Sequence, residues 1–161
     1  MRAKFCRAAW VGALVLSTAG VQWAGNESPT GRWKTIDDQS GQARGIVRLY
    51  EENGAIFGKI ESAFKASEAK EHCNLCKDER KGQPVIGMVV LRGLRKQGDE
   101  YTGGDILDPD TGIVYRCKLR LLDGGKRLLV RGYVLVPVLG RSQIWIREPE
   151  GAAADLQRGG R

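Results

Sequence analysis

The sequence contains little that could carry catalysis. His72 is its single histidine, and it lies in a charged loop beside two cysteines, where a solvated surface position is the simpler interpretation. No serine lies in the Gly-x-Ser-x-Gly pattern of a nucleophile elbow. Asp105 and Asp108 are the best pair of carboxylates, but Asp108 opens an Asp-Pro turn and Asp105 falls on the wet face of a strand. We therefore predict no catalytic residues and no cofactor, with an enzyme as the alternative to a binding protein.

Long hydrophobic runs are also lacking. The apolar stretch Ala8–Ala19 follows the basic segment Met1–Arg7 and ends in small residues, which is the order of a secretory signal. A stretch of this length is too short to span a bilayer comfortably. We expect residues 1–24 to be a signal peptide that is removed, with an uncleaved membrane anchor as the alternative. The mature protein would then be soluble, periplasmic or secreted, and without a transmembrane segment.

A cluster of like charges is missing as well. The formal charge of +7 includes Arg2, Lys4 and Arg7 of the leader, and without them 23 bases face 19 acids, a net charge of +4. The remaining bases alternate along the expected strands instead of forming a run. Nucleic acid is therefore not expected as a partner.

Cysteine is scarce, with four residues in the chain. Cys73 and Cys76 form a Cys-x-x-Cys motif, for which a structural disulfide is favoured because exported proteins oxidise such pairs. A redox-active dithiol stays open, although the thioredoxin-like βαβ context is absent. A metal site with His72 also stays open, but nothing in the spacing demands one, so no metal ligand is assigned. Cys117 has the parity of a buried strand position and should be a free thiol that packs as a small hydrophobe.

Alternation of apolar and charged residues is what the sequence does contain. From Ile113 to Leu121 the odd positions are apolar, while Arg116, Lys118 and Arg120 occupy the other parity, which is typical of a strand with one wet face. The chain has 22 glycines, and turn residues such as Asn53-Gly54 separate the repeats of this unit. The expected strands are Gly31–Ile36, Ala43–Glu51, Ala55–Ala63, Met88–Leu94, Tyr101–Leu107, Ile113–Leu121, Arg127–Val136 and Gln143–Arg147.

The order of these strands predicts an all-β fold, an up-and-down antiparallel barrel of about eight strands that occupies residues 25–147. Lys65–His72 would form at most a short helix, and residues 148–161 a disordered tail. Arg131 and Tyr133 would be polar anchors if their face points inward. The expected inward residues are Val47, Leu49, Ile56, Ile60, Val89, Leu91, Ile106, Tyr115, Leu119, Val130 and Val134.

Two resemblances support this fold. Gly31-Arg32-Trp33 is similar to the Gly-x-Trp motif that opens the lipocalins, in which a late arginine packs over the tryptophan; Arg147 or Arg141 would play that part here. A wider set of motifs resembles the domain of unknown function 2147 family, small exported bacterial proteins, and this resemblance implies a lipocalin-like barrel in the periplasm. The motifs are Gly31-x-Trp33-Lys34-Thr35-Ile36-Asp37, Cys73-x-x-Cys76-x-x-x-x-Lys81-Gly82-x-Pro84-x-x-Gly87, Gly104-x-Ile106-Leu107-Asp108-Pro109-x-x-Gly112-x-x-Tyr115, Arg131-Gly132-Tyr133 and Trp145-x-Arg147.

The functional prediction is an exported protein that holds a small apolar or amphipathic molecule inside the barrel. A barrel of this size either packs solid or encloses one small ligand, and glycines within the strands favour a cavity. The molecule would have an apolar body and one polar or anionic end. The alternatives are a packed barrel that binds an envelope protein, and a redox-active or metal-binding protein acting through the Cys73/Cys76 loop. The candidate ligand-binding residues are Val47, Leu49, Ile60, Leu91, Ile106, Tyr115, Leu119, Arg131 and Tyr133.

Overall fold

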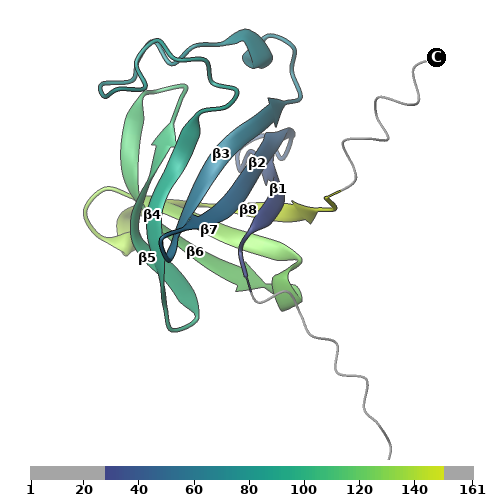
Figure 1. Cartoon of the computed structure of the whole chain (residues 1–161), viewed down its shortest axis with the longest axis vertical. Helices are drawn as coiled ribbons and strands as arrows, with labels where there is room; N and C mark the ends of the chain where they lie inside the picture. Colours follow the sequence, from purple (N-terminus) through teal and green to yellow (C-terminus); the bar gives the residue numbers. More distant parts are fainter. Residues whose placement is uncertain (1–27, 151–161) are drawn as a thin grey trace, which may run out of the picture.

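The computed structural model describes residues 28–150. Eight antiparallel strands follow one another around a closed barrel, and β1 pairs with β8 to complete it (Figure 1). The expected all-β, up-and-down barrel is thereby confirmed. The strands are β1 Gly31–Ile36, β2 Ala43–Glu52, β3 Ala55–Ala63, β4 Val89–Gln97, β5 Glu100–Asp108, β6 Ile113–Leu122, β7 Arg127–Tyr133 and β8 Gly140–Glu148.

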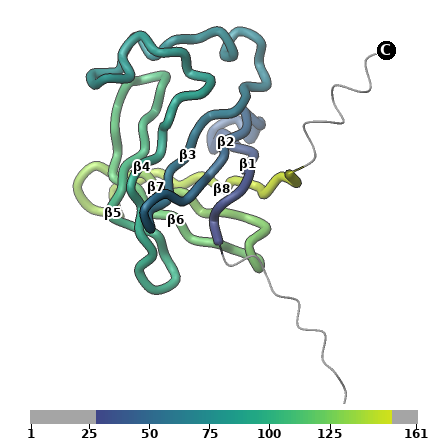
Figure 2. Tube along the Cα trace, viewed as in Figure 1, coloured from purple at the N-terminus to yellow at the C-terminus, as the bar shows by residue number. Residues whose placement is uncertain are grey.

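Short turns join most of the strands, as the turn residues indicate. At the β2–β3 hairpin Asn53 and Gly54 have φ angles of 51° and 71°, the left-handed pair that a two-residue turn of this type requires. The β3–β4 connection is the long one, and it runs along one end of the barrel, at the top of the view (Figure 2). It packs against the β5–β6 turn, where a Cβ on Gly112 would lie 2.1 Å from the carbonyl oxygen of Leu75. Glycine is needed there for both its φ of 67° and this close approach.

The core divides along the barrel axis. The larger cluster fills the end where β2–β3, β4–β5 and β6–β7 turn, and a smaller cluster lies beneath the β3–β4 connection. The larger cluster contains Trp33, Val47, Leu49, Ile56, Leu91, Leu94, Tyr101, Cys117, Leu119, Leu128, Val130 and Trp145. The smaller one contains Cys73, Cys76, Met88, Val90 and Leu107.

An arginine closes the filled end of the barrel. The guanidinium carbon of Arg147 lies 4.2 Å from the ring centroid of Trp33, a cation–π contact. The same guanidinium donates hydrogen bonds to the carbonyl oxygens of Gly125, Thr30 and Ser28. The late arginine that packs over Trp33 is therefore Arg147 and not Arg141.

Three local expectations need correction. Strand β7 ends at Tyr133 and not at Val136, and Val134 is 62% exposed instead of inward. A register shift between Gly58 and Lys59 turns Val90 inward in place of Val89.

Helical structure is confined to single 3-10 turns in the described residues. One, Glu68–Lys70, lies within the expected Lys65–His72 segment. Two further 3-10 turns, Asp123–Gly125 and Pro137–Leu139, lie at expected chain reversals, where no helical form was predicted. No helix between residues 28 and 150 is long and apolar enough to cross a membrane. The expected signal peptide, and all but residues 148–150 of the expected tail, lie outside the described residues.

Candidate ligand cavity

A cavity of about 420 Å³ occupies one end of the barrel, opposite the end that Trp33 and Arg147 close. We call the contact between these two residues the plug. Its walls come from the C-terminal ends of β1, β3, β5 and β7 and from the N-terminal halves of β2, β4, β6 and β8. Those strand ends meet at the β1–β2, β3–β4, β5–β6 and β7–β8 connections, which form the rim. The volume falls in the range of about 300–1,000 Å³ that is usual for small-molecule sites.

The inner wall is mainly apolar. Its deepest part is lined by aliphatic side chains and by the indole of Trp145, whose Nε1 donates a 3.0 Å hydrogen bond to Oε1 of Gln143. The Tyr115 side chain also lines this wall. Apolar walls with a few polar groups are what a site for an amphipathic molecule requires. The aliphatic residues of this inner wall include Ile46, Val47, Ile60, Val90, Ile106 and Val130.

Glycine creates part of this space, but not at every position. A Cβ on Gly132 would lie 3.5 Å from Cβ of Tyr115 and 3.6 Å from Cγ2 of Ile106, so a small side chain would fit there. At Gly58, in the filled end, a Cβ would lie 2.7 Å from Cδ2 of Leu49. Gly132 therefore opens the cavity, whereas Gly58 permits close packing.

Of the nine sequence-predicted binding residues, five line the cavity and four do not. Val47, Ile60, Ile106, Tyr115 and Tyr133 line the cavity. The other predicted residues do not.

Leu49, Leu91 and Leu119 are a correction to the predicted set. Each is at most 1% exposed and packs in the filled end of the barrel instead of the cavity lining. They share the inward parity of the cavity residues but lie farther along the barrel axis. Their role is to fill the core.

Arg131 is the second correction. Cross-strand pairing places Gly132 opposite Cys117, which is buried, so Arg131 points outward. Its guanidinium donates hydrogen bonds to the carbonyl oxygens of Pro137 (2.6 Å) and Val138 (3.2 Å) and to the hydroxyl of Ser142 (2.7 Å). It is a support for the β7–β8 connection and not a cavity anchor.

The rim carries charged residues that the sequence analysis did not single out. Arg44 on β2 forms ion pairs with Asp110 of the β5–β6 turn, at 2.6 Å, and with Glu68, at 3.5 Å. The hydrogen bond that Arg44 donates to Asp110 raises the pKa of Arg44 above its ordinary value. These ion pairs join β2 to the β5–β6 turn and to the β3–β4 connection, and the partners are far apart in the sequence, so no local pattern could reveal them.

Carboxylates outnumber guanidinium groups around the opening. The acidic lining residues are Asp37, Glu68, Glu71, Asp108 and Asp110, and the basic ones are Arg44 and Arg141. Arg141 is paired with Asp38 at 2.5 Å, and this hydrogen bond lowers the pKa of Asp38. Both bases are therefore already neutralised by partners.

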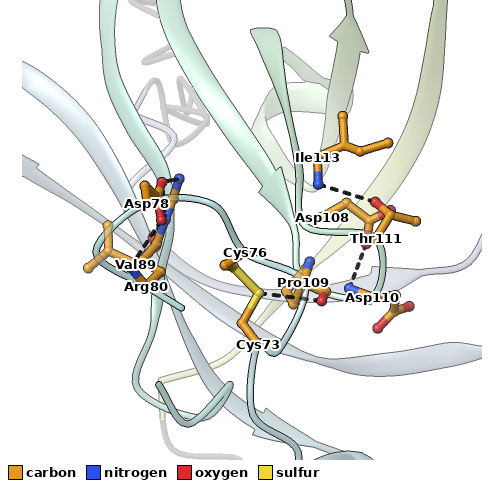
Figure 3. The surroundings of a disulfide bond; sticks show 10 residues. All are labelled: Cys73, Cys76, Asp78, Arg80, Val89, Asp108, Pro109, Asp110, Thr111 and Ile113. Atoms are coloured by element: carbon orange, nitrogen blue, oxygen red, sulfur yellow. Dashed lines mark hydrogen bonds and ion pairs between the residues drawn. A yellow bond between two sulfur atoms is a disulfide. The ribbon is translucent and has the colours of Figure 1, made fainter. Parts of the chain in front are cut away.

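The Cys73–Cys76 pair forms a disulfide at the edge of this rim (Figure 3). Sγ of Cys73 lies 3.5 Å from the carbonyl oxygen of Pro109, so the disulfide packs against the β5–β6 turn. Nearby, Arg80 is buried and donates hydrogen bonds to the Asp78 carboxylate and to the Val89 carbonyl oxygen. The hydrogen bond from Arg80 to the Asp78 carboxylate lowers the pKa of Asp78 to about 2. The disulfide and the Arg80–Asp78 pair thus brace the loop internally, while the contact of Cys73 with Pro109 and the hydrogen bond from Arg80 to Val89 hold it against the barrel.

Cys117 is the free cysteine of the described residues, and its surroundings make its thiol unreactive. Cys117 is free and 0% exposed, and its burial raises its pKa well above the ordinary value. Within residues 28–150, no three His, Cys, Asp or Glu side chains are grouped so that they could hold a metal ion. The oxidised Cys73 and Cys76 have no thiolate to offer a metal or a substrate disulfide.

Comparisons with known proteins agree with this architecture. Protein HP1028 from the human pathogen Helicobacter pylori, described as belonging to the lipocalin family, has a similar structure, with a TM-score of 0.69 and 20% sequence identity over 81% of this chain and 89% of that one. At this identity the likeness is one of fold. No curated protein matched the chain. The profile of the family described as "uncharacterized protein conserved in bacteria (DUF2147)" matches residues 31–147. The chain belongs to this DUF2147 family, and its fold is a lipocalin-like barrel.

Proposed function

We propose that this protein binds one small apolar or amphipathic molecule in the barrel and does so after export, in the periplasm or outside the cell. The observation that carries the proposal is the cavity of about 420 Å³ in a barrel whose other end is filled. A barrel with only a structural role gains stability from filling such a space. The basic and apolar N-terminal leader supports the location.

The rim narrows the expected ligand class. Of the five rim carboxylates, those of Glu68 and Asp110 are paired with Arg44, while Arg141 is paired with Asp38. An anionic end group would therefore find no unpaired guanidinium in the lining and would meet the carboxylates of Asp37, Glu71 and Asp108. A neutral or cationic end group is better matched to this surface. We therefore propose an amphiphile whose apolar body lies against Val47, Ile106 and Val130, with a neutral or cationic end at the rim. Of the polar or anionic end that was expected from the sequence, this proposal keeps the polar one and gives up the anionic one.

Fluorescence titration with an environment-sensitive apolar dye tests the proposal. Saturable binding with one site per chain is expected. Competition with a long-chain alcohol, amine and fatty acid of equal length should displace the dye, with the fatty acid the weakest competitor. The absence of saturable binding would overturn the cavity proposal, and a fatty acid that competes best would overturn the proposed end group.

A substitution at Glu71 tests whether the rim carboxylates select the charge of the ligand's end group. It lines the rim, and its carboxylate makes no ion pair within the described residues. Glu71→Gln should leave the dye affinity unchanged and narrow the preference for amine over fatty acid by a factor of about 1.4–5, because one exposed charge contributes about 0.2–1 kcal/mol. An unchanged preference would show that the rim charges do not select the ligand.

A further inference from the structure

The β7–β8 connection exposes an unusual number of aliphatic side chains. We call residues 134–139 the lip. Its exposed fractions are 62% for Val134, 79% for Leu135, 46% for Val136, 79% for Val138 and 72% for Leu139. Surface loops are usually polar, and clustered apolar exposure marks a surface that meets another apolar phase.

The lip is preformed. The Arg131 guanidinium donates hydrogen bonds to the carbonyl oxygens of Pro137 and Val138, and the Leu139 amide donates to the Val136 carbonyl oxygen at 3.0 Å. These bonds hold the turn in one conformation with its apolar side chains exposed, and the carbonyl oxygens of Val136, Pro137 and Val138 have internal donors. Entry of the turn into the interfacial region of a bilayer therefore leaves fewer bare backbone groups to desolvate.

The sheet that carries the lip has bases without carboxylate partners. Strands β6, β7 and β8 together carry seven Arg or Lys residues and one acid, Glu148. Three of these bases are paired with acids outside the three strands (Lys118 with Glu100, Arg127 with Asp123, Arg141 with Asp38), and Arg147 covers Trp33. The other three, Arg116, Arg120 and Arg131, make no ion pair within residues 28–150. Arg116, which is exposed, pairs across the sheet with Tyr133, the residue that precedes the lip. Arg120 is also exposed and shares this outer face. The charge on this side of the barrel matches anionic lipid head groups.

We propose that the barrel docks on an anionic lipid surface through the lip, with the β6–β7–β8 face toward the head groups. The lip projects from the barrel as a narrow turn, at the left of the view (Figure 1), which suits insertion better than a flat protein interface of about 800 Å² per partner. Val134 and Leu139 also line the cavity, so the docked lip would place the cavity entrance at the lipid. The rim carboxylates lie on the β1–β2, β3–β4 and β5–β6 connections, so the docked barrel tilts toward its β7–β8 side.

Vesicle co-sedimentation of the processed protein, isolated after export, tests this docking. Phosphatidylcholine vesicles with an equal amount of phosphatidylglycerol should bind it, pure phosphatidylcholine should bind it more weakly, and added salt should weaken the binding. Leu135→Glu combined with Val138→Glu should lower vesicle binding at least about tenfold, because two exposed side chains would no longer enter the apolar region. The matched control is Phe64→Glu, which alters a 50% exposed side chain directly after β3, outside the β6–β7–β8 face, and should bind like the wild type.

A second variant tests how much the exposed arginines of β6 contribute to binding anionic vesicles. Arg116→Gln combined with Arg120→Gln should reduce the preference for phosphatidylglycerol while leaving the weak binding to phosphatidylcholine. No vesicle binding by the wild type, or equal binding by the lip variant, would overturn the proposal. So would a wild-type dimer in lipid-free solution that the lip variant abolishes, since a second copy would then cover the lip.

This proposal goes beyond the ligand-binding function and can fail separately from it. Leu135 and Val138 do not line the cavity, so the lip variant should bind the apolar dye with unchanged affinity. Dye binding without vesicle binding would remove the docking proposal alone. Vesicle binding without dye binding would remove the cavity proposal alone.

Discussion

Replacing Gly132 with leucine should fill part of the cavity and stabilise the barrel. The first carbon of the new side chain would make contacts of 3.5 Å with Tyr115 and 3.6 Å with Ile106, which are ordinary van der Waals distances. Glycine within a strand costs about 0.5–1 kcal/mol relative to alanine. Each further buried methylene contributes about 0.8 kcal/mol, although the open rim keeps part of the side chain in water. We expect the free energy of unfolding to rise by about 1–2 kcal/mol.

Urea denaturation measures this change, and dye titration of the same variant should show saturable binding lost. The matched control is Gly58→Ala, in which the added carbon would lie 2.7 Å from Leu49 and 3.0 Å from Leu91. Overpacking should lower the stability of that variant by about 1–3 kcal/mol. If Gly132→Leu destabilises the protein as Gly58→Ala does, the space inside the barrel is not open and the reasoning fails.

Three further predictions concern the rim loop and the buried thiol. Cys73→Ser should lower the free energy of unfolding by only about 1–3 kcal/mol, because the disulfide with Cys76 closes a small loop; a larger loss in denaturant titration would contradict the entropic account. In the native protein Cys117 should react slowly with a thiol reagent and become reactive on denaturation, and rapid native labelling would refute its burial. The pKa of Asp78 is about 2, held below its ordinary 3.8 by the hydrogen bond from Arg80, so its ionised form stabilises the fold above about pH 4 and loses this effect as the pH falls toward 2. Asp78→Asn should therefore flatten the loss of stability over this range, and an unchanged acid profile measured by thermal denaturation would show that the pair contributes nothing.

The strands were predictable because alternation reports which face of a strand is buried. Parity does not report depth, however. Val47 and Leu49 have the same parity on β2, yet one lines the cavity and the other fills the closed end. That difference depends on which ends of the strands are plugged, and the plug joins Trp33 to Arg147 across the whole chain length.

The rest of the site depended on contacts between distant segments. Arg44 reads as an ordinary surface base in the sequence, and its ion pairs with Asp110 and Glu68 exist only after the barrel closes. The sequence predicts a strand as far as Val136, which includes the first three residues of the lip, because valine is common in strands. Pro137 was the signal that could have placed the turn earlier, together with Arg131, whose side chain holds it.

Methyl chemical shifts, measured with and without a saturating long-chain alcohol, test the central claim most directly. A ligand inside the cavity should shift the methyl signals of Val47, Ile60 and Ile106, which line it. The methyl signals of Leu119 and Leu128, which are 0% exposed in the filled end, should stay in place. Shifts confined to exposed residues, or no shifts at a ligand concentration that saturates the dye site, would contradict a binding site inside the barrel.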